Sequence, residues 1–496
     1  MERRKYDAVV IGSGFSGLAA ACYLAKDGFK TAIVEKNDSL GGRARQFSEE
    51  GFVFDMGPSW YWMPDVFEHF FSSFGKSPSD YYNLIRLDPS YKVIYKNSDI
   101  DIPAQWSELK TLFDKLEPGS SKHLEEFMRQ AEIKYKVGMK DFVYKPGHSF
   151  TEFLDFDLLK KATKLDIFSS IGSHIRKFFN NKELIQLMEF PILFLGALPK
   201  NTPSLYSMMN YADMKLGTWY PEGGMHKIIE GMVSLARELG VEIFTGEEVK
   251  NVEISNNTIS GLLTSSSVFE ADNIICSADY HHFEQHILPK SYRRYTEKYW
   301  DKRKLAPSCL LFYIGVDKKL NNLEHHNLFF DADFEKHTEA IYGDVKWPED
   351  PLFYTCVPSK TDPTVAPKGK ENIFILIPMA PGLIENDDIS EKYYDIVMSR
   401  LEKHCGENIK DHVIYKRSYG ANNFISDYHA YKGNAYGLAN TLDQTAILKP
   451  KMKNNKLTNL LYTGQLTVPG PGVPPSLISG EIVASEIIKY KSGQLA

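Results

Sequence analysis

The stretch that decides the fold is KYDAVVIGSGFSGLAAACYLAKDGFKTAIVEK, residues 5–36. Its first part, Tyr6 to Ile11, is rich in β-branched side chains and is typical of a buried parallel strand. A G-x-G-x-x-G motif at residues 12–17 and an alanine-rich helix follow, and a second strand, Thr31 to Val34, ends at Glu35. This order of strand, glycine loop, helix, strand and acid predicts a dinucleotide-binding βαβ unit.

The spacing assigns a physical role to each part of this motif. Gly12 permits the tight turn, Gly14 lets a pyrophosphate approach the backbone, and Gly17 lets the helix pack closely on the sheet. The amino-terminal end of the helix favours the phosphate charge, and Glu35 can accept hydrogen bonds from ribose hydroxyls. Because an acid rather than an arginine stands there, NADP is disfavoured at this position.

Two later stretches favour FAD over NAD. Leu40-Gly41-Gly42-Arg43-Ala44-Arg45 permits close backbone approach, and its first arginine can lie along a bound pyrophosphate. This extension resembles the FAD-binding signature of the amine oxidase and carotenoid desaturase superfamily. FDMGPSWYWMP (54–64) resembles the segment that runs beside the flavin in those enzymes, although an ordinary aromatic loop remains an alternative for it.

Near the C-terminus, VPGPGVPPSLISG (468–480) follows a short predicted strand, Leu460 to Thr463, and Gly464. The last helix is predicted to begin near Pro475-Ser476, where a proline in the first turn costs no hydrogen bond. Its free amides and positive dipole end would face the pyrimidine edge of a flavin. The proline- and glycine-rich loop is therefore predicted to hold the helix rigidly against the cofactor, as a flavin clamp.

Together, the G-x-G-x-x-G with its acid, the Gly-Gly-Arg extension and T-G-x-x-x-x-P-G-P-G-V-P-P-S closely resemble the bacterial-type phytoene desaturase family over the whole chain. Amine oxidases fit less well, because they usually carry Gly-Glu at the position of Gly464-Gln465. The resemblance implies an FAD-dependent, membrane-associated enzyme that binds a long apolar C40 polyene. Such enzymes form double bonds by hydride transfer to flavin N5, with a quinone or oxygen as the electron acceptor.

The resemblance also implies the fold class, which is α/β with a discontinuous Rossmann-like FAD-binding domain of the glutathione reductase-like superfamily. We assign 1–75, 220–285 and 450–496 to this domain, and 76–140 with 286–449 to a mixed-sheet substrate domain. Residues 141–219 are expected to form a helical lid or membrane-associating region. Residues 286–449 show no second G-x-G-x-x-G, which argues against a separate NADPH domain.

The expected cofactor contacts follow from these motifs, with a backbone group of Val249 expected at the adenine. The residues are Gly12, Ser13, Gly14, Phe15, Ser16, Gly17, Glu35, Lys36, Gly42, Arg43, Ala44, Gly57, Pro58, Ser59, Val249, Gly464, Gly472, Val473 and Pro474. No side-chain catalyst is assigned. Asp141 and Glu189 are acids near apolar segments that could take a proton.

A metal site is not expected. His281-His282 and His325-His326 are adjacent pairs, and neighbouring side chains point apart on a strand or helix. The five cysteines are scattered without a Cys-x-x-Cys pair, which favours reduced thiols in a cytoplasmic protein. The net charge of −6 provides no basic footprint for nucleic acid.

Membrane contact is expected through residues 153–198. Within them, apolar residues recur at near-helical spacing over 153–181, with lysines between them. Either an amphipathic helix in the bilayer interface or an ordinary helix packed on the core fits this pattern. The apolar run 184–199 is too short to span and predicts a buried helix or a cavity wall. We expect neither a signal peptide nor a membrane-spanning helix. The expected location is cytoplasmic, peripherally associated with the inner face of the cell membrane.

Three alternatives to a phytoene desaturase remain open at this point. A 3,4-desaturase of a hydroxylated carotene would use the same motifs, and a carotene isomerase would use reduced flavin without net oxidation. A non-catalytic prenyl-lipid-binding relative is the third alternative, which the complete flavin clamp disfavours.

Overall fold

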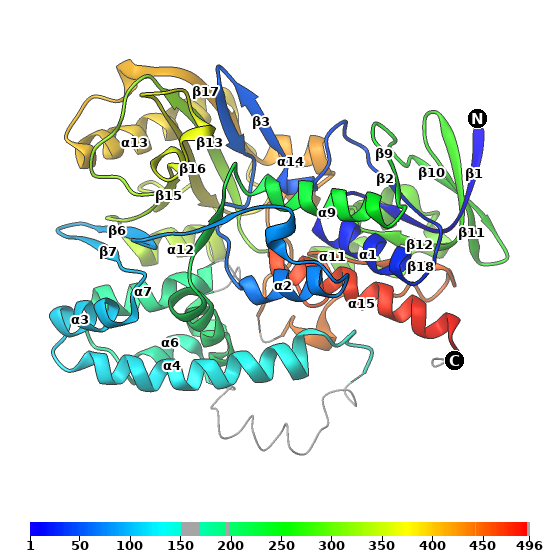
Figure 1. Cartoon of the computed structure of the whole chain (residues 1–496), viewed down its shortest axis with the longest axis horizontal. Coiled ribbons are helices and arrows are strands. Elements are labelled where there is room, and N and C mark those ends of the chain that lie inside the picture. Colours follow the sequence, from blue (N-terminus) through cyan, green and yellow to red (C-terminus); the bar gives the residue numbers. More distant parts are fainter. Residues whose placement is uncertain (150–168, 194–197, 442, 494–496) are drawn as a thin grey trace.

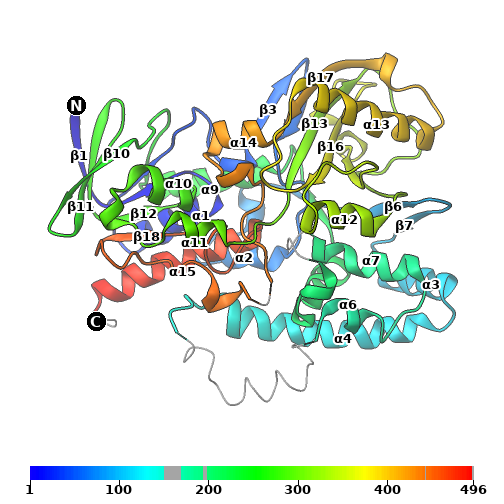
Figure 2. The same cartoon turned by 180° about the vertical axis from the view of Figure 1, so that it is seen from behind.

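Two sheets and a helical region make up the computed structural model, which describes residues 1–149, 169–193, 198–441 and 443–493. Both ends of the chain lie beside the first sheet, at one end of the molecule (Figures 1 and 2). The second sheet and the helical region occupy the other end, one above the other in Figure 1. The architecture is the predicted α/β fold with a Rossmann-like sheet and a separate mixed sheet.

The first sheet gathers strands from three distant parts of the chain. Its order is β10 (Asn251–Ser255), β11 (Thr258–Leu263), β12 (Ser267–Cys276), β1 (Glu2–Ile11), β2 (Thr31–Val34) and β9 (Glu242–Phe244), and β18 (Leu460–Tyr462) pairs with β12. β1 is parallel to both neighbours, with Ile11 opposite Cys276 on one side and Val34 on the other. The carboxyl ends of these strands therefore meet at one edge of the sheet, where ligands of such folds bind.

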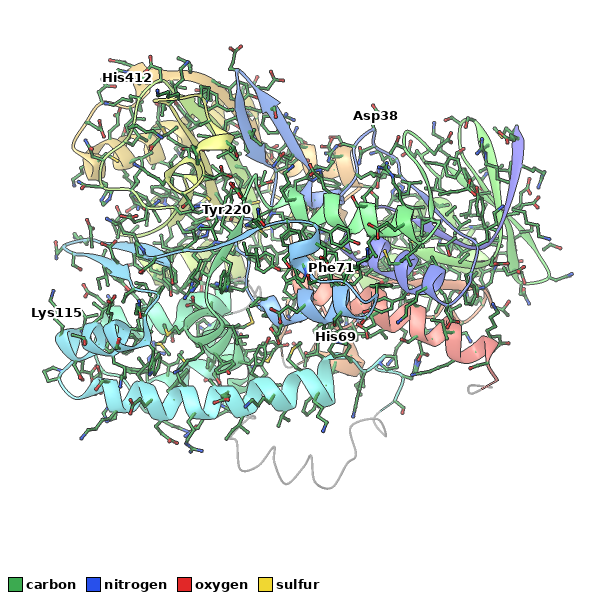
Figure 3. The ribbon with its side chains drawn as sticks, viewed as in Figure 1. Asp38, His69, Phe71, Lys115, Tyr220 and His412 are labelled. Atoms are coloured by element: carbon green, nitrogen blue, oxygen red, sulfur yellow. The ribbon has the colours of Figure 1, made fainter. Side chains whose placement is uncertain are left out.

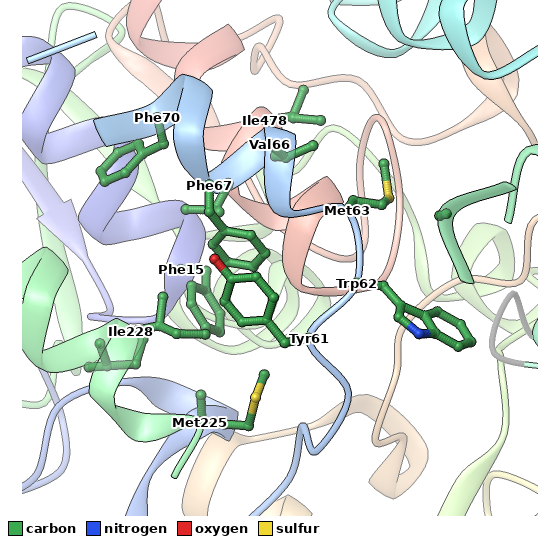
Figure 4. Close-up of a cluster of buried hydrophobic side chains, with 14 of the residues drawn as sticks. Phe15, Tyr61, Trp62, Met63, Val66, Phe67, Phe70, Met225, Ile228 and Ile478 are labelled. Atoms are coloured by element: carbon green, nitrogen blue, oxygen red, sulfur yellow. The ribbon is translucent and has the colours of Figure 1, made fainter. Parts of the chain in front are cut away.

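Two helices from opposite ends of the sequence pack together over this sheet. α1 (Phe15–Lys26) contacts α15 (Val473–Lys491), and α9 (His226–Glu238) also lies against α1. Small residues allow the close approach: a Cβ added at Gly480 would lie closer than 3.0 Å to the Ser16 carbonyl oxygen. Figure 4 shows the apolar cluster that joins these helices to α2 (Pro64–Ser72), with Phe15, Phe67 and Ile478 among its members.

The second sheet has the order β17 (Val413–Tyr419), β13 (Ser308–Val316), β16 (Glu371–Met379), β15 (Phe353–Cys356), β14 (His326–Phe330), β6 (Tyr91–Tyr95) and β7 (Asp99–Ile102). It is mixed because β14 and β6 are parallel whereas the other pairs are antiparallel. Side chains alternate across β13: Phe312 joins the core beneath α13 (Asp387–Cys405), and Leu311 joins the core shared with the first sheet. β6 and β7 form an antiparallel pair, with Val93 opposite Ile100.

Residues 104–210 are mostly helical where the structure describes them. The described helices are α3 (Trp106–Leu116), α4 (Ser120–Val137), α6 (Ile171–Ile175), α7 (Lys182–Leu193) and α8 (Met208–Tyr211). α7 confirms the predicted buried helix, because Leu184 and Phe190 are almost fully buried. Ile171 and Ile175 are also buried in the core, so this part of the predicted membrane segment packs inward. Residues 150–168, which contain the first part of that segment, lie outside the described residues.

The remaining strands and helices are short connections around the two sheets. They are β3 (Gln46–Glu49), β4 (Phe52–Asp55), β5 (Leu84–Arg86), β8 (Trp219–Pro221), α10 (Tyr280–His282), α11 (Glu297–Asp301), α12 (Phe334–Tyr342) and α14 (Ala421–Tyr428). Figure 3 shows side chains filling the space between the ribbons, with Tyr220 labelled on β8. No described helix is both long and apolar enough to cross a bilayer.

One predicted boundary is wrong by two residues. The last helix begins at Val473 rather than near Pro475, with Gly472 immediately before it. The physical reason is that proline is tolerated at the first positions of a helix, so Pro474 and Pro475 both fit inside the first turn.

The contact between α1 and α15 predicts a destabilising substitution. Gly480→Ala should lower the free energy of unfolding by about 1–3 kcal/mol, because the methyl group would overlap the Ser16 carbonyl and the Ala19 side chain. Thermal or denaturant unfolding measures this change. Lys489→Ala, at an exposed position of the same helix, is the control and should be nearly neutral. A Gly480→Ala protein as stable as the wild type would contradict the close approach.

Candidate functional site

The glycine loop after β1 combines one crowded glycine with one open glycine. A Cβ added at Gly17 would lie closer than 3.0 Å to the Gly12 carbonyl oxygen, so α1 can pack against the turn only with glycine at that position. Gly12 itself has a φ of +99°, which favours glycine. A Cβ added at Gly14 would meet no atom within 4 Å. The loop therefore leaves space over Gly14, where a pyrophosphate can approach the backbone.

Glu35 is held in place by the loop that it faces. Its carboxylate is buried and accepts hydrogen bonds from the Ser13 amide at 2.8 Å and the Ser13 hydroxyl at 2.7 Å. The Asn37 amide donates to the other carboxylate oxygen at 2.9 Å. The Asn37 side-chain amide also donates to that oxygen, at 3.1 Å. Four donors therefore occupy the roughly four lone-pair sites of an ionised carboxylate, and a ribose hydroxyl would bind Glu35 by replacing one of them.

Arg43 places a buried cation beside the same loop. Gly41 and Gly42 have φ values of +108° and +55°, and this turn brings Gly42 against Gly14. The guanidinium donates to the Asn434 carbonyl at 3.2 Å, but its Nε has no hydrogen-bond partner among the described residues. Burial lowers the pKa of Arg43, and the charge of Asp279 opposes that shift. A buried, incompletely paired cation of this kind fits an anionic group such as a pyrophosphate.

Hydrogen bonds connect the first sheet to the helix that follows the proline- and glycine-rich loop. The Gly464 amide donates to the Ser479 hydroxyl at 3.0 Å, and the Thr463 hydroxyl donates to the same oxygen at 2.9 Å. These bonds join the end of β18 to the second turn of α15. Gly472 has a φ of +114°, so a side chain there would strain the backbone before it touched any ligand.

The structure brings all the predicted contact residues except Gly17 to the wall of one cavity of about 510 Å³. Gly17 instead acts through its packing beneath Gly12. Several lining residues at this dinucleotide end escaped the sequence analysis, namely Glu248, Ser277, Ala278, Asp279, His282, Asp427, Tyr428 and Gln465. The end of β12 could have indicated residues 277–279, because ligands bind at the carboxyl ends of parallel strands. The other positions carry no sequence signal of their own.

The opposite end of the cavity is apolar. It is lined from the helical region and the second sheet by Trp60, Trp62, Met63, Phe190, Met208, Met209, Leu328, Phe330, Leu352, Phe353, Phe374 and Leu376. His337 also lines it, but burial lowers the pKa of His337 to about 4, so the ring is neutral near pH 7. Both His337 nitrogens are used, one with the Pro378 carbonyl and one with the Leu352 amide. This end therefore suits a hydrocarbon better than a charged ligand.

Neither acid named from the sequence reaches this cavity as a described lining residue. Glu189 is buried and forms an ion pair with the more exposed Arg176, and burial raises the pKa of the Glu189 carboxyl group. The Asp141 side chain lies outside the described residues. The described acids in the lining are Glu35, Glu247, Glu248, Asp279 and Asp427, and hydrogen bonds or charge contacts connect each of them to the dinucleotide end.

The two histidine pairs behave differently. His281 stacks on Tyr431 and His282 stacks on His429, so this pair points apart as predicted. The expectation is wrong for His325 and His326, whose ring centroids lie 4.5 Å apart. The reason is that β14 begins at His326, so His325 lies before the strand and is not held to the alternation of a strand.

The cavity combines a glycine loop and its acid with a buried arginine and an apolar extension. These features define an FAD-dependent oxidoreductase. The chain belongs to the flavin containing amine oxidoreductase family, whose model matches residues 15–488, and within it to the carotenoid desaturases. It is 40% identical over 485 residues to a carotenoid 3,4-desaturase of Haloarcula japonica, covering 97% of this chain and 98% of the relative. It is 31% identical over 494 residues to a 4,4′-diapophytoene desaturase (4,4′-diaponeurosporene-forming) of Staphylococcus aureus, with the same coverage.

Solved structures support the fold. An oxidoreductase from Methanosarcina mazei matches with a TM-score of 0.63 and 17% identity, covering 97% of this chain and all of that chain. Cyclohexylamine oxidase from Brevibacterium oxydans matches with a TM-score of 0.60 and 13% identity, covering 99% and 100%. At this level of identity the likeness concerns the arrangement of the sheets and helices.

The open space over Gly14 generates a prediction about cofactor retention. Gly14→Val should yield folded protein with at least about tenfold less bound flavin, because the side chain would occupy the place of the pyrophosphate. Gly14 has a φ of −69°, which any residue adopts, so the substitution does not strain the backbone. Flavin absorbance per chain and circular dichroism measure the two outcomes. Gly14→Ala should give an intermediate loss, and full flavin occupancy in Gly14→Val would contradict the assignment.

Proposed function

We propose that the protein introduces carbon–carbon double bonds into a long carotenoid. The observation that carries this proposal is the continuity of one cavity from the dinucleotide loop to the apolar wall formed by Trp60, Phe190 and Phe330. The names of the two full-length relatives point to the same substrate class. When bound, FAD would supply the two-electron acceptor chemistry that a desaturation needs.

The chain's own residues would contribute placement and exclusion of water. Apolar and aromatic side chains from α7, α8 and the second sheet would hold the polyene in one register. The first turn of α15, with Val473 and Pro474 in the cavity wall, would direct its positive dipole end towards the cofactor. No described carboxylate stands at the apolar end, so the proposed reaction relies on positioning more than on a side-chain base.

Two candidates for the carotenoid and the bond have support. The family resemblance favours phytoene, whereas the 40% identity to a 3,4-desaturase favours the 3,4 bond of a later carotene. Incubation of the FAD-loaded protein with liposomes that contain either substrate separates them. A loss of two hydrogens per new double bond, measured by chromatography and mass, identifies the substrate. An isomer of unchanged mass would indicate a carotene isomerase, and no change with any carotenoid would favour a lipid-binding role.

The apolar wall can be tested at one position. Met209 lines the cavity from α8 without being fully buried. Met209→Glu should lower carotenoid turnover by at least about tenfold, because an unpaired charge is costly beside a hydrocarbon. Met209→Leu conserves volume and should stay close to the wild type. Bound flavin should be unchanged in both variants. Equal turnover in the two variants would show that the substrate does not pass this wall.

We also propose reversible attachment to the inner face of the cell membrane, where such a hydrocarbon resides. A basic groove at the C-terminal helix supports this: Arg294, Lys451, Lys453 and Lys456 line a hollow of about 380 Å³ together with Tyr490. The Tyr490 side chain is 64% exposed, and the Lys453 ammonium lies 5.4 Å from its ring centroid. Aromatic and basic side chains together suit an interface with anionic lipid. A membrane quinone or oxygen would then reoxidise the cofactor.

Charge reversal tests this attachment. Lys453→Glu with Lys456→Glu should lower partitioning onto anionic liposomes by at least about thirtyfold, since each basic residue near the surface contributes about 1 kcal/mol. Flotation at low and high salt measures the change. The matched control is Lys392→Glu with Lys403→Glu, on α13 at the opposite end of the molecule (Figure 1). Equal flotation of both double variants would contradict a role for this groove.

A further inference from the structure

Two histidines and a cysteine meet within the second sheet, behind the cavity wall. His326 begins β14 and is the register partner of Cys356 at the end of β15, and His325 precedes β14. One ligand atom from each residue lies within 4.8 Å of the others, and all three side chains are buried. The His325 ring lies 4.6 Å from the ring of Tyr220, which Figure 3 labels.

In both imidazole rings, the nitrogen that is held by a hydrogen bond is Nδ1. His325 Nδ1 lies 2.8 Å from the Thr361 hydroxyl oxygen, and His326 Nδ1 lies 2.6 Å from the Tyr354 hydroxyl oxygen. The Nε2 atoms of both rings have no hydrogen-bond partner among the described residues. When both Nδ1 atoms donate to these hydroxyls, both Nε2 atoms carry lone pairs with nothing to bind. Buried polar atoms left unsatisfied in this way are costly, so a ligand between them would remove a penalty.

We propose that His325, His326 and Cys356 form a site for a single Zn²⁺ ion. Two imidazole nitrogens and a thiolate are ligands that zinc prefers, and a second bond from the other nitrogen of each imidazole is usual for zinc-bound histidine. Binding displaces the proton of the Cys356 thiol to solvent and leaves the sulfur as a thiolate. Ligand atoms around such an ion lie about 3.3–3.8 Å apart, so the three side chains close by roughly 1 Å on binding.

The surroundings leave room for one further ligand. A small space of about 20 Å³, lined by His325 and Cys356, lies next to the cluster, which is enough for one water molecule. Asp55 lines the same space, and its carboxylate accepts hydrogen bonds from the Met225 and His226 amides. Burial raises the pKa of Asp55, and these hydrogen bonds oppose the shift.

The position of the site indicates a structural role. The His326 ring stacks on Trp60 with centroids 4.1 Å apart, and Trp60 lines the large cavity. The Tyr354 hydroxyl, which contacts His326, donates to the Ser59 hydroxyl at 3.0 Å. An ion at this point ties β14 and β15 to the wall formed by Ser59 and Trp60. The ion takes no part in electron transfer, because Zn²⁺ has no redox chemistry.

The test uses the full-length, FAD-loaded protein purified under reducing conditions, with Zn²⁺ alone and Co²⁺ alone as probes. After equilibration with Zn²⁺ and removal of excess, elemental analysis should find one zinc ion per chain. Replacement by Co²⁺ should give d–d absorption at longer wavelengths than the flavin bands and a thiolate charge-transfer band. Cys356→Ser should abolish the charge-transfer band, and His325→Gln should lower zinc content to a small fraction of the wild-type value.

Cys405→Ser is the matched control, since Cys405 is a buried thiol on α13 outside the cluster, and it should keep the zinc and the Co²⁺ spectrum. A wild-type protein that retains no zinc and shows no thiolate band with Co²⁺ would overturn the proposal, and a buried water molecule would then satisfy the two nitrogens. Full zinc content in Cys356→Ser and His325→Gln would overturn it as well. If a cluster variant fails to fold, the wild-type Co²⁺ spectrum decides. Flavin content is measured in parallel, so loss of the zinc site is distinguishable from loss of the cofactor.

Discussion

The structure depends on the contact between the first helix and the turn that precedes it. Gly17 lies so close to the Gly12 carbonyl that no side chain fits between them, and this contact fixes where α1 begins. The same position leaves the face over Gly14 open and directs the amino-terminal end of α1 towards it. One packing constraint therefore creates both the stable helix–sheet layer and the place for a phosphate group.

A second close approach extends this arrangement to the far end of the sequence. Gly480 lets α15 approach the backbone of α1, and Ser479 anchors the end of β18. The Gly472 turn and the first turn of α15 are thereby held at the cavity, opposite the glycine loop. Two segments more than 400 residues apart form one rigid surface, so a cofactor between them would meet groups that need little reorganisation.

The second sheet contributes side chains to two separate hydrophobic cores. Alternate residues of β13 face the core beneath α13 and the core shared with the first sheet. The same alternation directs Leu328, Phe330, Phe374 and Leu376 towards the large cavity and produces its apolar end. His326 and Tyr354 lie on the same face of this sheet as Leu328, as the register of β14 and β15 shows. Both are buried, so their polar atoms must bond to one another or to a ligand.

The sequence by itself determined the class of fold, the cofactor and most of the dinucleotide end. Local rules explain this success. A motif of six residues shows which glycines permit a turn, a close contact or a left-handed φ. The acid follows that motif at a recognisable distance in the sequence. The strands at residues 6–11, 31–34 and 460–463 and the helices after the two glycine-rich loops also followed from local patterns, apart from the start of the last helix. The tertiary structure alone decided that Tyr428 and Gln465 join the site. It also decided that Ile171 and Ile175 pack inward and that His325 faces His326. These features depend on strand register and on contacts between distant segments, and no short-range pattern encodes which distant side chain lies opposite.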